Sequence, residues 1–164
     1  TNPPKISKRK LGKLYGTILP PVRKGSLFIW PVKGTLISSF GAKGRGLHND
    51  GVNIMAPKGT VVRSAGSGIV AYAGNELRGF GNLLLIKHGN GWVTAYAHNE
   101  TLTVRRGDKV KKGQAVARVG SSGNVFRPQL HFEIRKGNKA VDPILKISNI
   151  SGRRIAVHKR ISKG

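Results

Sequence analysis

Glycine interrupts this chain at short intervals, between short runs of Val, Ile and Leu. The 164 residues contain 23 glycines and eight prolines. A glycine inside a helix costs about 1 kcal/mol relative to alanine, whereas short strands are ordinarily bounded by such turn residues. No stretch has the apolar periodicity of a long helix. The sequence therefore predicts an all-β fold built on an antiparallel sheet, and its length suits one domain with a hydrophobic core.

Two segments show the strand pattern most clearly. The segment NLLLIKHGNGWVTAYAH predicts a hairpin whose turn is HGNG. On its second strand, alternation with period two puts four side chains on one face: Trp92, Thr94, Tyr96 and His98. In LHFEIR and the residue before it, the same alternation separates Leu130, Phe132 and Ile134 from Gln129, His131, Glu133 and Arg135. We expect one face of this strand to pack and the other to be free for a site.

Two further segments predict shorter strands. GTVVRSAGSGIVAYAG supplies two β-rich runs that are split at residues 66–68. VRRGDKVKKGQAVARVGSSGN has turns at residues 107–108 and 112–113, followed by an alternating strand. Biotinyl and lipoyl carrier domains share this second pattern, but they need a modifiable lysine at a hairpin tip, and none is found here. We interpret the segment as a β-hairpin of a kind common to several all-β folds.

The chain is strongly basic along its whole length. Thirty Lys and Arg against six Asp and Glu give a net charge of +24, which attracts polyanions at low salt. All six acidic residues fall within 27–147. We therefore expect a basic N-terminal arm or linker at 1–26, a folded domain at 27–147 and a basic tail at 148–164. Anionic polymers of a cell envelope are candidate partners of these arms, as are anionic lipids; solvated charge without a dedicated partner is the alternative.

Cysteine is absent, which excludes disulfides and thiolate metal sites. No apolar run is long enough to span a membrane, and no signal-peptide pattern begins at Thr1. If the protein is exported, we expect this chain to be a mature or trimmed form.

Six segments in chain order together resemble the LytM domain of the M23 zinc peptidase family. They are WPVKGTLISSFGAKG, HNDGVNIMAPKGTVVRSAGSGIVAYAG, GNLLLIKHGNGWVTAYAH, VRRGDKVKKGQAVARVGSSG, PQLHFEIRKG and VDP. The resemblance runs from about Trp30 to Pro143, and its motifs are most similar to the DipM-like branch of alphaproteobacterial envelope factors. It implies an antiparallel β-sheet fold with a central groove.

The resemblance also implies which residues occupy the positions of the family's zinc site. Active members hold zinc with His-x-x-x-Asp and with the second His of His-x-His, and three ligands leave an open position for water. On that pattern this chain has Asn49 and Asn53 in the first motif, a lone His98, and Gln129 with His131 in the last. Carboxamides bind zinc weakly and do not exchange protons near neutral pH. The resemblance thus implies no metal, no other cofactor and no catalytic residue.

A shifted metal site is the alternative to this alignment. His48 and Asp50 flank Asn49 and, with His131, would supply three ligands after a slip of one residue. Such a slip turns the core face of the following strand outward, so we favour a surface role for His48, and for Asp50 a role as turn former or arginine partner. His88 is interpreted as a turn residue and His158 as part of the basic tail.

Taken together, the sequence and the resemblance predict a non-enzymatic regulator of the periplasm or cell envelope. Its degenerate groove is lined by Asn49, Asn53, His98, Gln129 and His131, with Trp92 and Tyr96 as groove-wall or core aromatics. The expected partner is a cell-wall hydrolase, an N-acetylmuramoyl-L-alanine amidase, which the chain binds and activates. The rival hypotheses are an active zinc endopeptidase of peptidoglycan and a plain peptidoglycan-binding module; a nucleic-acid binder is disfavoured because stacking aromatics are few.

Overall fold

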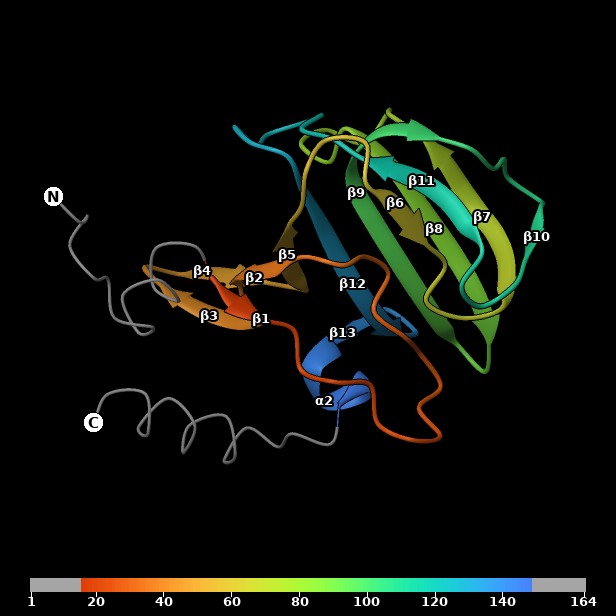
Figure 1. The fold of residues 1–164 in the computed structure, drawn as a ribbon, viewed down its shortest axis with the longest axis horizontal. Helices are drawn as coiled ribbons and strands as arrows, with labels where there is room; N and C mark the ends of the chain where they lie inside the picture. Colours follow the sequence, from red (N-terminus) through yellow and green to blue (C-terminus); the bar gives the residue numbers. More distant parts are fainter. Residues whose placement is uncertain (1–15, 149–164) are drawn as a thin grey trace, which may run out of the picture.

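The computed structural model describes residues 16–148, and these form an almost entirely antiparallel β structure (Figure 1). The predicted all-β fold is confirmed. The elements are β1 Thr17–Ile18, β2 Thr35–Ser38, β3 Gly41–Gly44, β4 Leu47–Asn49, β5 Val52–Met55, β6 Val61–Arg63, β7 Gly68–Gly74, β8 Asn82–Gly89, β9 Trp92–Leu102, β10 Lys109–Val110, β11 Ala115–Val119, β12 Gln129–Lys136, β13 Lys139–Val141 and the short helix α2 Pro143–Ile147.

One large sheet carries most of these strands, in the order β1-β2-β5-β12-β9-β8-β7-β10. The strand β11 pairs with β6 and with the far end of β9, and the β6–β11 pair lies over the β8 and β7 region in Figure 1. The strands β3 and β4 form a separate two-stranded hairpin that projects from one side of the molecule.

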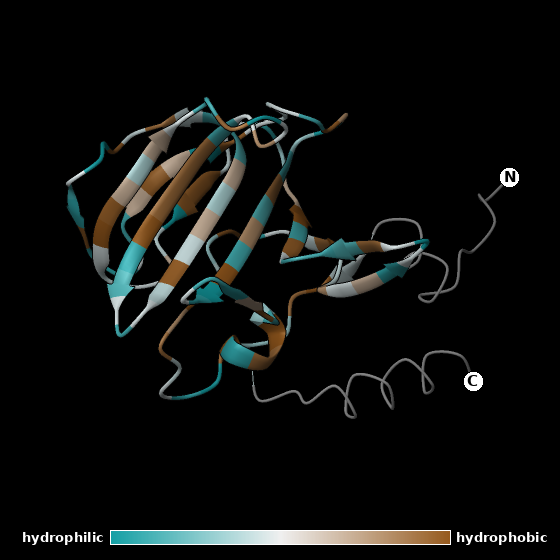
Figure 2. Ribbon diagram, turned by 180° about the vertical axis from the view of Figure 1, so that it is seen from behind, coloured by the Kyte–Doolittle hydropathy of each residue, from teal (hydrophilic) through white to brown (hydrophobic). Residues whose placement is uncertain are grey.

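The hydrophobic core fills the space between the large sheet and the β6–β11 pair. Its fully buried side chains include Val62 from β6, Val116 from β11, Ile86 from β8, Tyr96 from β9 and Phe132 from β12. Brown and pale bands alternate along the central strands in Figure 2, as expected of strands that bury one face. A smaller apolar cluster of Leu83, Ala95 and Ala97 lies on the other face of the sheet.

The predicted hairpins have different outcomes. The strands β8 and β9 pair around the HGNG turn, so that prediction is confirmed. The two runs split at residues 66–68 are β6 and β7, also as predicted. The interpretation of residues 104–124 as one hairpin is wrong, because β10 pairs with β7 whereas β11 pairs with β6 and β9. Those partners lie far away in sequence, and the local pattern does not specify them.

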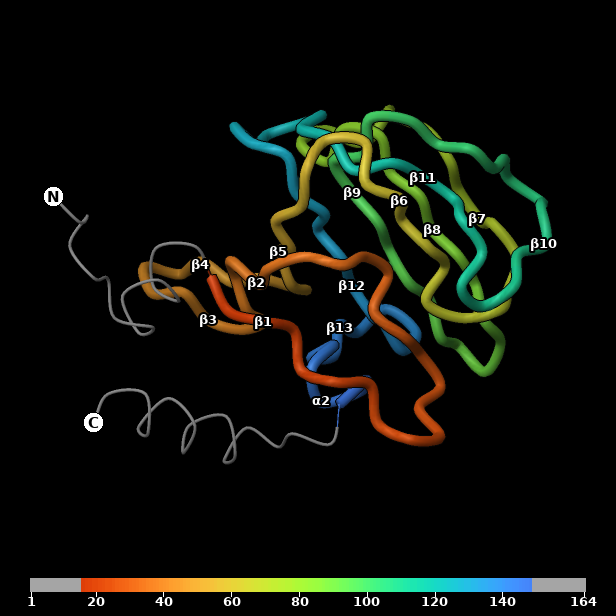
Figure 3. Tube along the Cα trace, in the orientation of Figure 1, coloured from red at the N-terminus to blue at the C-terminus, as the bar shows by residue number. Residues whose placement is uncertain are grey.

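The part of the N-terminal segment that the structure describes follows the domain closely. The strand β1 pairs with β2, the N–H of Arg23 donates to the carbonyl of Ile147, and Trp30 donates its indole N–H to the carbonyl of Pro20. Figure 3 shows this segment running past α2 before it reaches β2. The remainder of both predicted arms, residues 1–15 and 149–164 with His158, lies outside the described residues, and the domain boundaries stay a prediction.

Candidate binding site

Four of the predicted site residues come together where β5 pairs with β12. Asn53 stands opposite His131, and Met55 stands opposite Gln129. Asn49 ends β4 and reaches the same place. The alternate residues of the two strands face the core instead: Val52, Ile54, Leu130 and Phe132. Strand alternation therefore turns the polar side chains onto one surface, which we call the site face and define by Asn49, Asn53, His98, Gln129 and His131.

Hydrogen bonds of fixed direction join the carboxamides of the site face. The backbone N–H of Gly51 can only donate, and it lies 3.0 Å from Oδ1 of Asn49. Nδ2 of Asn49 therefore donates to Oδ1 of Asn53 at 3.0 Å, and Nδ2 of Asn53 donates to Oε1 of Gln129 at 2.8 Å. Gly51 has to be glycine, since a Cβ there would lie 2.1 Å from the carbonyl oxygen of Phe132.

His131 ends this network with both of its ring nitrogens engaged. Nδ1 lies 3.1 Å from Oδ1 of Asn53, and Nε2 lies 2.7 Å from Oε2 of Glu133. Both partners are acceptors, so both hydrogen bonds require a proton on the ring, and neither nitrogen offers a lone pair to a metal.

Glu133 is a buried carboxylate that is held ionised. Burial by itself raises the pKa of its carboxyl group, but hydrogen bonds and positive charge from His131 and Arg135 outweigh burial and hold the pKa below its ordinary value. Nη1 of Arg135 lies 2.7 Å from Oε1 of Glu133. The sequence had placed Glu133 and Arg135 on this face by alternation without giving them a role.

His98 reaches the site face because the backbone of β9 departs from regular strand geometry there. Its φ is +68°, a left-handed value that is uncommon for a residue with a side chain. The pairing of β8 with β9 shifts between Asn82 and Leu84, with one extra residue on β9, as in a β-bulge. The bulge turns the imidazole of His98 toward that of His131, with ring centroids 6.2 Å apart.

The imidazole of His98 is fixed by a loop, and burial favours its neutral form. Nδ1 lies 2.8 Å from the carbonyl oxygen of Ser122, which can only accept, so Nδ1 carries the proton. Burial lowers the pKa of His98, the bond to Ser122 opposes that effect, and the charge of His131 adds to it. Nε2 of His98 makes no hydrogen bond within residues 16–148, and it is an acceptor available to a bound molecule.

The two aromatic residues predicted near this surface lie elsewhere. Strand alternation predicted that Trp92 and Tyr96 share a face with His98. That prediction is wrong, because the bulge turns His98 to the opposite face and leaves Trp92 and Tyr96 facing the core. Tyr96 is fully buried in the core beside Phe132, with ring centroids 5.5 Å apart. Trp92 packs at the edge of the core, and the ammonium group of Lys136 lies over its ring, 4.8 Å from the ring centroid.

Of the three residues of the alternative metal site, His48 and Asp50 lie together but form no group of three with His131. Nδ1 of His48 lies 3.0 Å from Oδ1 of Asp50, and both side chains are about half exposed. Oδ2 of Asp50 lies 3.9 Å from Nη1 of Arg135, so its predicted role as an arginine partner is confirmed. Within residues 16–148 no group of three His, Asp or Glu is placed to hold a metal ion. One imidazole and two carboxamides make a hydrogen-bonding surface, and not the charged donor set that zinc requires.

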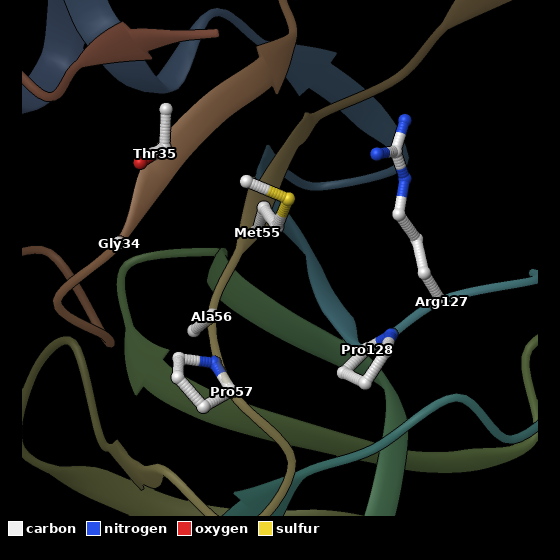
Figure 4. Close-up of a pocket in the computed structure, with 7 residues that line it drawn as sticks. All are labelled: Gly34, Thr35, Met55, Ala56, Pro57, Arg127 and Pro128. Carbon is white, nitrogen blue, oxygen red and sulfur yellow. The ribbon is translucent and has the colours of Figure 1, made fainter. Parts of the chain in front are cut away.

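An apolar pocket of about 430 Å³ adjoins the site face (Figure 4). Met55 lies between Thr35 and Arg127 in this view, with Pro57 and Pro128 beside it. Met55 is two residues beyond Asn53 on β5 and opposite Gln129, so the pocket continues the same surface. The lining residues are Gly34, Thr35, Met55, Ala56, Pro57, Arg127 and Pro128.

Sequence reasoning missed two loop residues that build the site. The carbonyl of Phe80 accepts from the backbone N–H of His98 at 2.9 Å, and the phenyl ring lies 6.4 Å from the imidazole of His131. Ser122 orients His98 through its carbonyl oxygen and also accepts the N–H of Asn82 on its hydroxyl. The glycines around both residues signal loops in the sequence, but they do not show that the two loops meet.

The all-β fold and the histidines and carboxamides of the site face can be compared with known proteins. Residues 47–143, more than half of the chain, match peptidase family M23. The chain therefore belongs to peptidase family M23, and the resemblance to LytM domains is confirmed.

Individual relatives sharpen this assignment. The chain is 52% identical over 124 residues to the cell division protein DipM of Caulobacter vibrioides, an alignment that covers 72% of this chain and 20% of that protein. It is 45% identical over 119 residues to the murein hydrolase activator NlpD of Escherichia coli, covering 73% of this chain and 31% of that protein. The chain thus spans under a third of the length of both relatives.

Solved structures of the family share the fold. The catalytic domain of the prophage-encoded M23 protein EnpA from Enterococcus faecalis superposes with a TM-score of 0.62 at 32% identity, covering 76% of this chain and 95% of that domain. The two relatives by sequence are named as a division protein and an activator, and not as peptidases. In the part of the chain that the structure describes, no helix has the length and apolar character to cross a membrane.

Proposed function

We propose that this chain is a catalytically inactive LytM domain that binds and activates a cell-wall hydrolase, an N-acetylmuramoyl-L-alanine amidase, during peptidoglycan remodelling and cell division. The observation that carries the proposal is the hydrogen-bond network of the site face. It uses the side chains at the positions of the family's zinc ligands to bond one another, and both nitrogens of His131 are committed to oxygen acceptors. The names of the relatives DipM and NlpD support the same function.

The commitment of the polar groups of this network to one another supports an inactive site. A zinc peptidase needs an open coordination position that lowers the pKa of a bound water. Asn49 and Asn53 are neutral and bond each other; Asn49 also bonds Ser38 and Gly51, and Asn53 also bonds Gln129 and His131. The carboxylate nearest to His131 belongs to Glu133, which bonds His131 and Arg135. We propose that the chain holds no zinc and does not hydrolyse peptidoglycan.

A rigid polar surface beside an apolar pocket is suited to binding a protein segment. The free Nε2 of His98 accepts a hydrogen bond from the partner, and the pocket at Met55 receives an apolar side chain. The guanidinium of Arg127 stands at the pocket and favours a carboxylate nearby. We propose the periplasm or cell envelope as the place where this happens, since relatives carry lipoprotein names.

The test is an amidase assay on purified peptidoglycan with and without this chain. We expect stimulation, and we expect Met55→Glu to reduce it at least tenfold, because the variant places a charge in the apolar pocket. Thr103→Glu makes the same change in charge on an exposed residue away from the pocket and is the matched control. Pelleting with peptidoglycan without any stimulation of an amidase would favour the plain peptidoglycan-binding module instead.

A further inference from the structure

The fold gathers five exposed cations at the end of the large sheet that is remote from the site face. We call this set the basic edge: Lys87, Arg105, Arg106, Lys109 and Lys111. The strand β10 is the last strand of the sheet order, four places from β12. Ile69 of β7 stands opposite Lys87 on one side and Lys109 on the other, so the two lysines flank it on the same surface.

Hydrogen bonds hold the two turns of the basic edge against the sheet. The N–H of Gly107 donates to the carbonyl of Val70 at 2.8 Å, and the N–H of Val70 donates to the carbonyl of Asp108 at 2.9 Å. The N–H of Lys112 donates to the hydroxyl of Ser67 at 3.0 Å. The cations are therefore displayed on a fixed backbone, and binding a ligand does not require this backbone to be ordered first.

Within residues 16–148 none of these cations forms an ion pair with a carboxylate. The ion pairs found between residues 16 and 148 involve Lys58, Arg135 and two histidines, and none includes a residue of the basic edge. The acidic residue within this stretch, Asp108, uses Oδ2 to accept the backbone N–H of Arg105. Residues 1–26 and 148–164 contain no acidic residue and cannot supply a counter-charge.

The need to protect the exposed edge of the sheet from pairing with other chains explains only some of the cations of the basic edge. Lysines on an edge strand discourage association with other chains, and Lys109 on β10 fits that role. Arg105 and Arg106 lie in the turn before β10 and do not need to be there for protection. The cations spread over successive strands and turns, and the apolar side chain among them, Ile69, is 49% exposed. The set contains no aromatic residue on which a nucleic-acid base would stack.

We propose that the basic edge binds the phosphate groups of an anionic phospholipid surface. Each lysine or arginine held near such a surface contributes about 1 kcal/mol, and the apolar Ile69 suits the headgroup boundary. The strand β10 lies four places from β12 in the sheet order, so a membrane bound at this edge leaves the paired strands β5 and β12 open to a partner protein. This inference does not depend on the proposed function, because it uses none of the site-face residues.

The experiment is co-sedimentation of the full chain with phosphatidylcholine vesicles that contain or lack phosphatidylglycerol. The test variant is the double substitution Arg106→Gln with Lys109→Gln. The matched control is Lys43→Gln with Lys139→Gln, which removes two exposed cations outside the basic edge and gives the same net charge. We expect the test variant to lose about thirtyfold in affinity for the anionic vesicles, and the control to lose less than about threefold.

Three results would overturn the proposal. Equal losses in the two variants would mean that net charge alone drives the binding. An unchanged affinity in the test variant would place any membrane contact elsewhere. Binding of duplex DNA or peptidoglycan that depends on the basic edge, with no binding to anionic vesicles, would assign the surface to a different polyanion. Thermal unfolding of both variants, monitored by circular dichroism, establishes that each is folded.

Discussion

Two polar networks lie on opposite faces of the same sheet, and each contains a histidine. On the site face, Asn49, Asn53 and Glu133 surround His131. On the core face, the N–H of Ala65 donates to the hydroxyl of Tyr96, that hydroxyl bonds Thr94, and Thr94 bonds Nε2 of His88. His88 had been interpreted as a turn residue, but it belongs to β8 and is partly buried.

The two histidines have opposite requirements for protons. His131 faces an acceptor at each nitrogen and is satisfied when both carry protons. His88 donates from Nδ1 to the carbonyl of Ser67 and accepts from Thr94, which requires the neutral ring, and burial lowers its pKa accordingly. The core network is therefore neutral and structural, whereas the site network contains the charged groups of Glu133 and Arg135 at a surface where a partner is expected to bind.

The largest expected effect is a gain of metal binding at the site face. In the double variant Asn49→His with Asn53→Asp, we expect one zinc per chain, because Nδ2 of Asn49 and Nδ1 of His131 already lie 3.0 Å and 3.1 Å from Oδ1 of Asn53. Glu133 would remain hydrogen-bonded to the ring, as partners of ligand histidines commonly are. Calorimetric zinc titration measures this gain, and the control Asn49→Ala with Asn53→Ala should bind none. A failure of the first variant to bind zinc would show that the scaffold has lost more than its ligands.

The next effect is a loss of stability when the charge of the site network is removed. Glu133→Ala leaves His131 and Arg135 without their common carboxylate, and we expect a loss of about 3 kcal/mol in the free energy of unfolding. Urea denaturation measures it. Asp50→Asn removes an acid that is half exposed and 3.9 Å from Arg135, and its effect should stay within about 0.5 kcal/mol. If the two variants lost the same free energy of unfolding, the buried carboxylate of Glu133 would contribute no more to stability than the exposed one of Asp50.

Breaking the core network should cost less. Tyr96→Phe removes the hydroxyl that accepts the buried N–H of Ala65, and we expect a loss of about 1–2 kcal/mol without any change in partner activation. Tyr72→Phe is the matched control, because the hydroxyl of Tyr72 accepts the N–H of Glu76 in an exposed turn. Chemical denaturation and the amidase assay together measure both expectations. If Tyr96→Phe lost amidase activation but kept normal stability, the core network would be shown to affect partner activation, which would contradict the expected separation of the two networks.

Much of the site was predictable because it follows from strand alternation. The pattern of β12 separated Gln129, His131 and Glu133 from the core residues, and the family resemblance located Asn49 and Asn53. The family resemblance placed His98 in the groove, but strand alternation does not predict its direction, because a bulge depends on how two strands pair and not on the residues near position 98. The hydrogen bond between Asn53 and Gln129, 76 residues apart, likewise depends on the register of β5 with β12.

The smallest expected effect is the dependence of stability on pH. The pKa values of His88 and His98 are lowered by burial from 6.5, so the unfolded chain binds protons more readily than the folded chain between the lowered values and 6.5. The contribution of these two histidines to the free energy of unfolding is then full above about pH 6.5, and it is lost as the pH falls from there through the lowered pKa values of the folded chain. The carboxyl group of Glu133 adds a second decline below its ordinary value of 4.5. Unfolding midpoints recorded from pH 7.5 to 4 test this, and a stability that rises on acidification would contradict it.

The most direct test of the account is the metal content of the natural chain. Protein purified without chelator or affinity tag is subjected to elemental analysis and then to zinc titration, alongside the variant His131→Ala. We expect far less than one zinc per chain and no difference between the two proteins. One equivalent of zinc that is lost in His131→Ala would contradict it, and would show that the carboxamide network gives way to a working metal site.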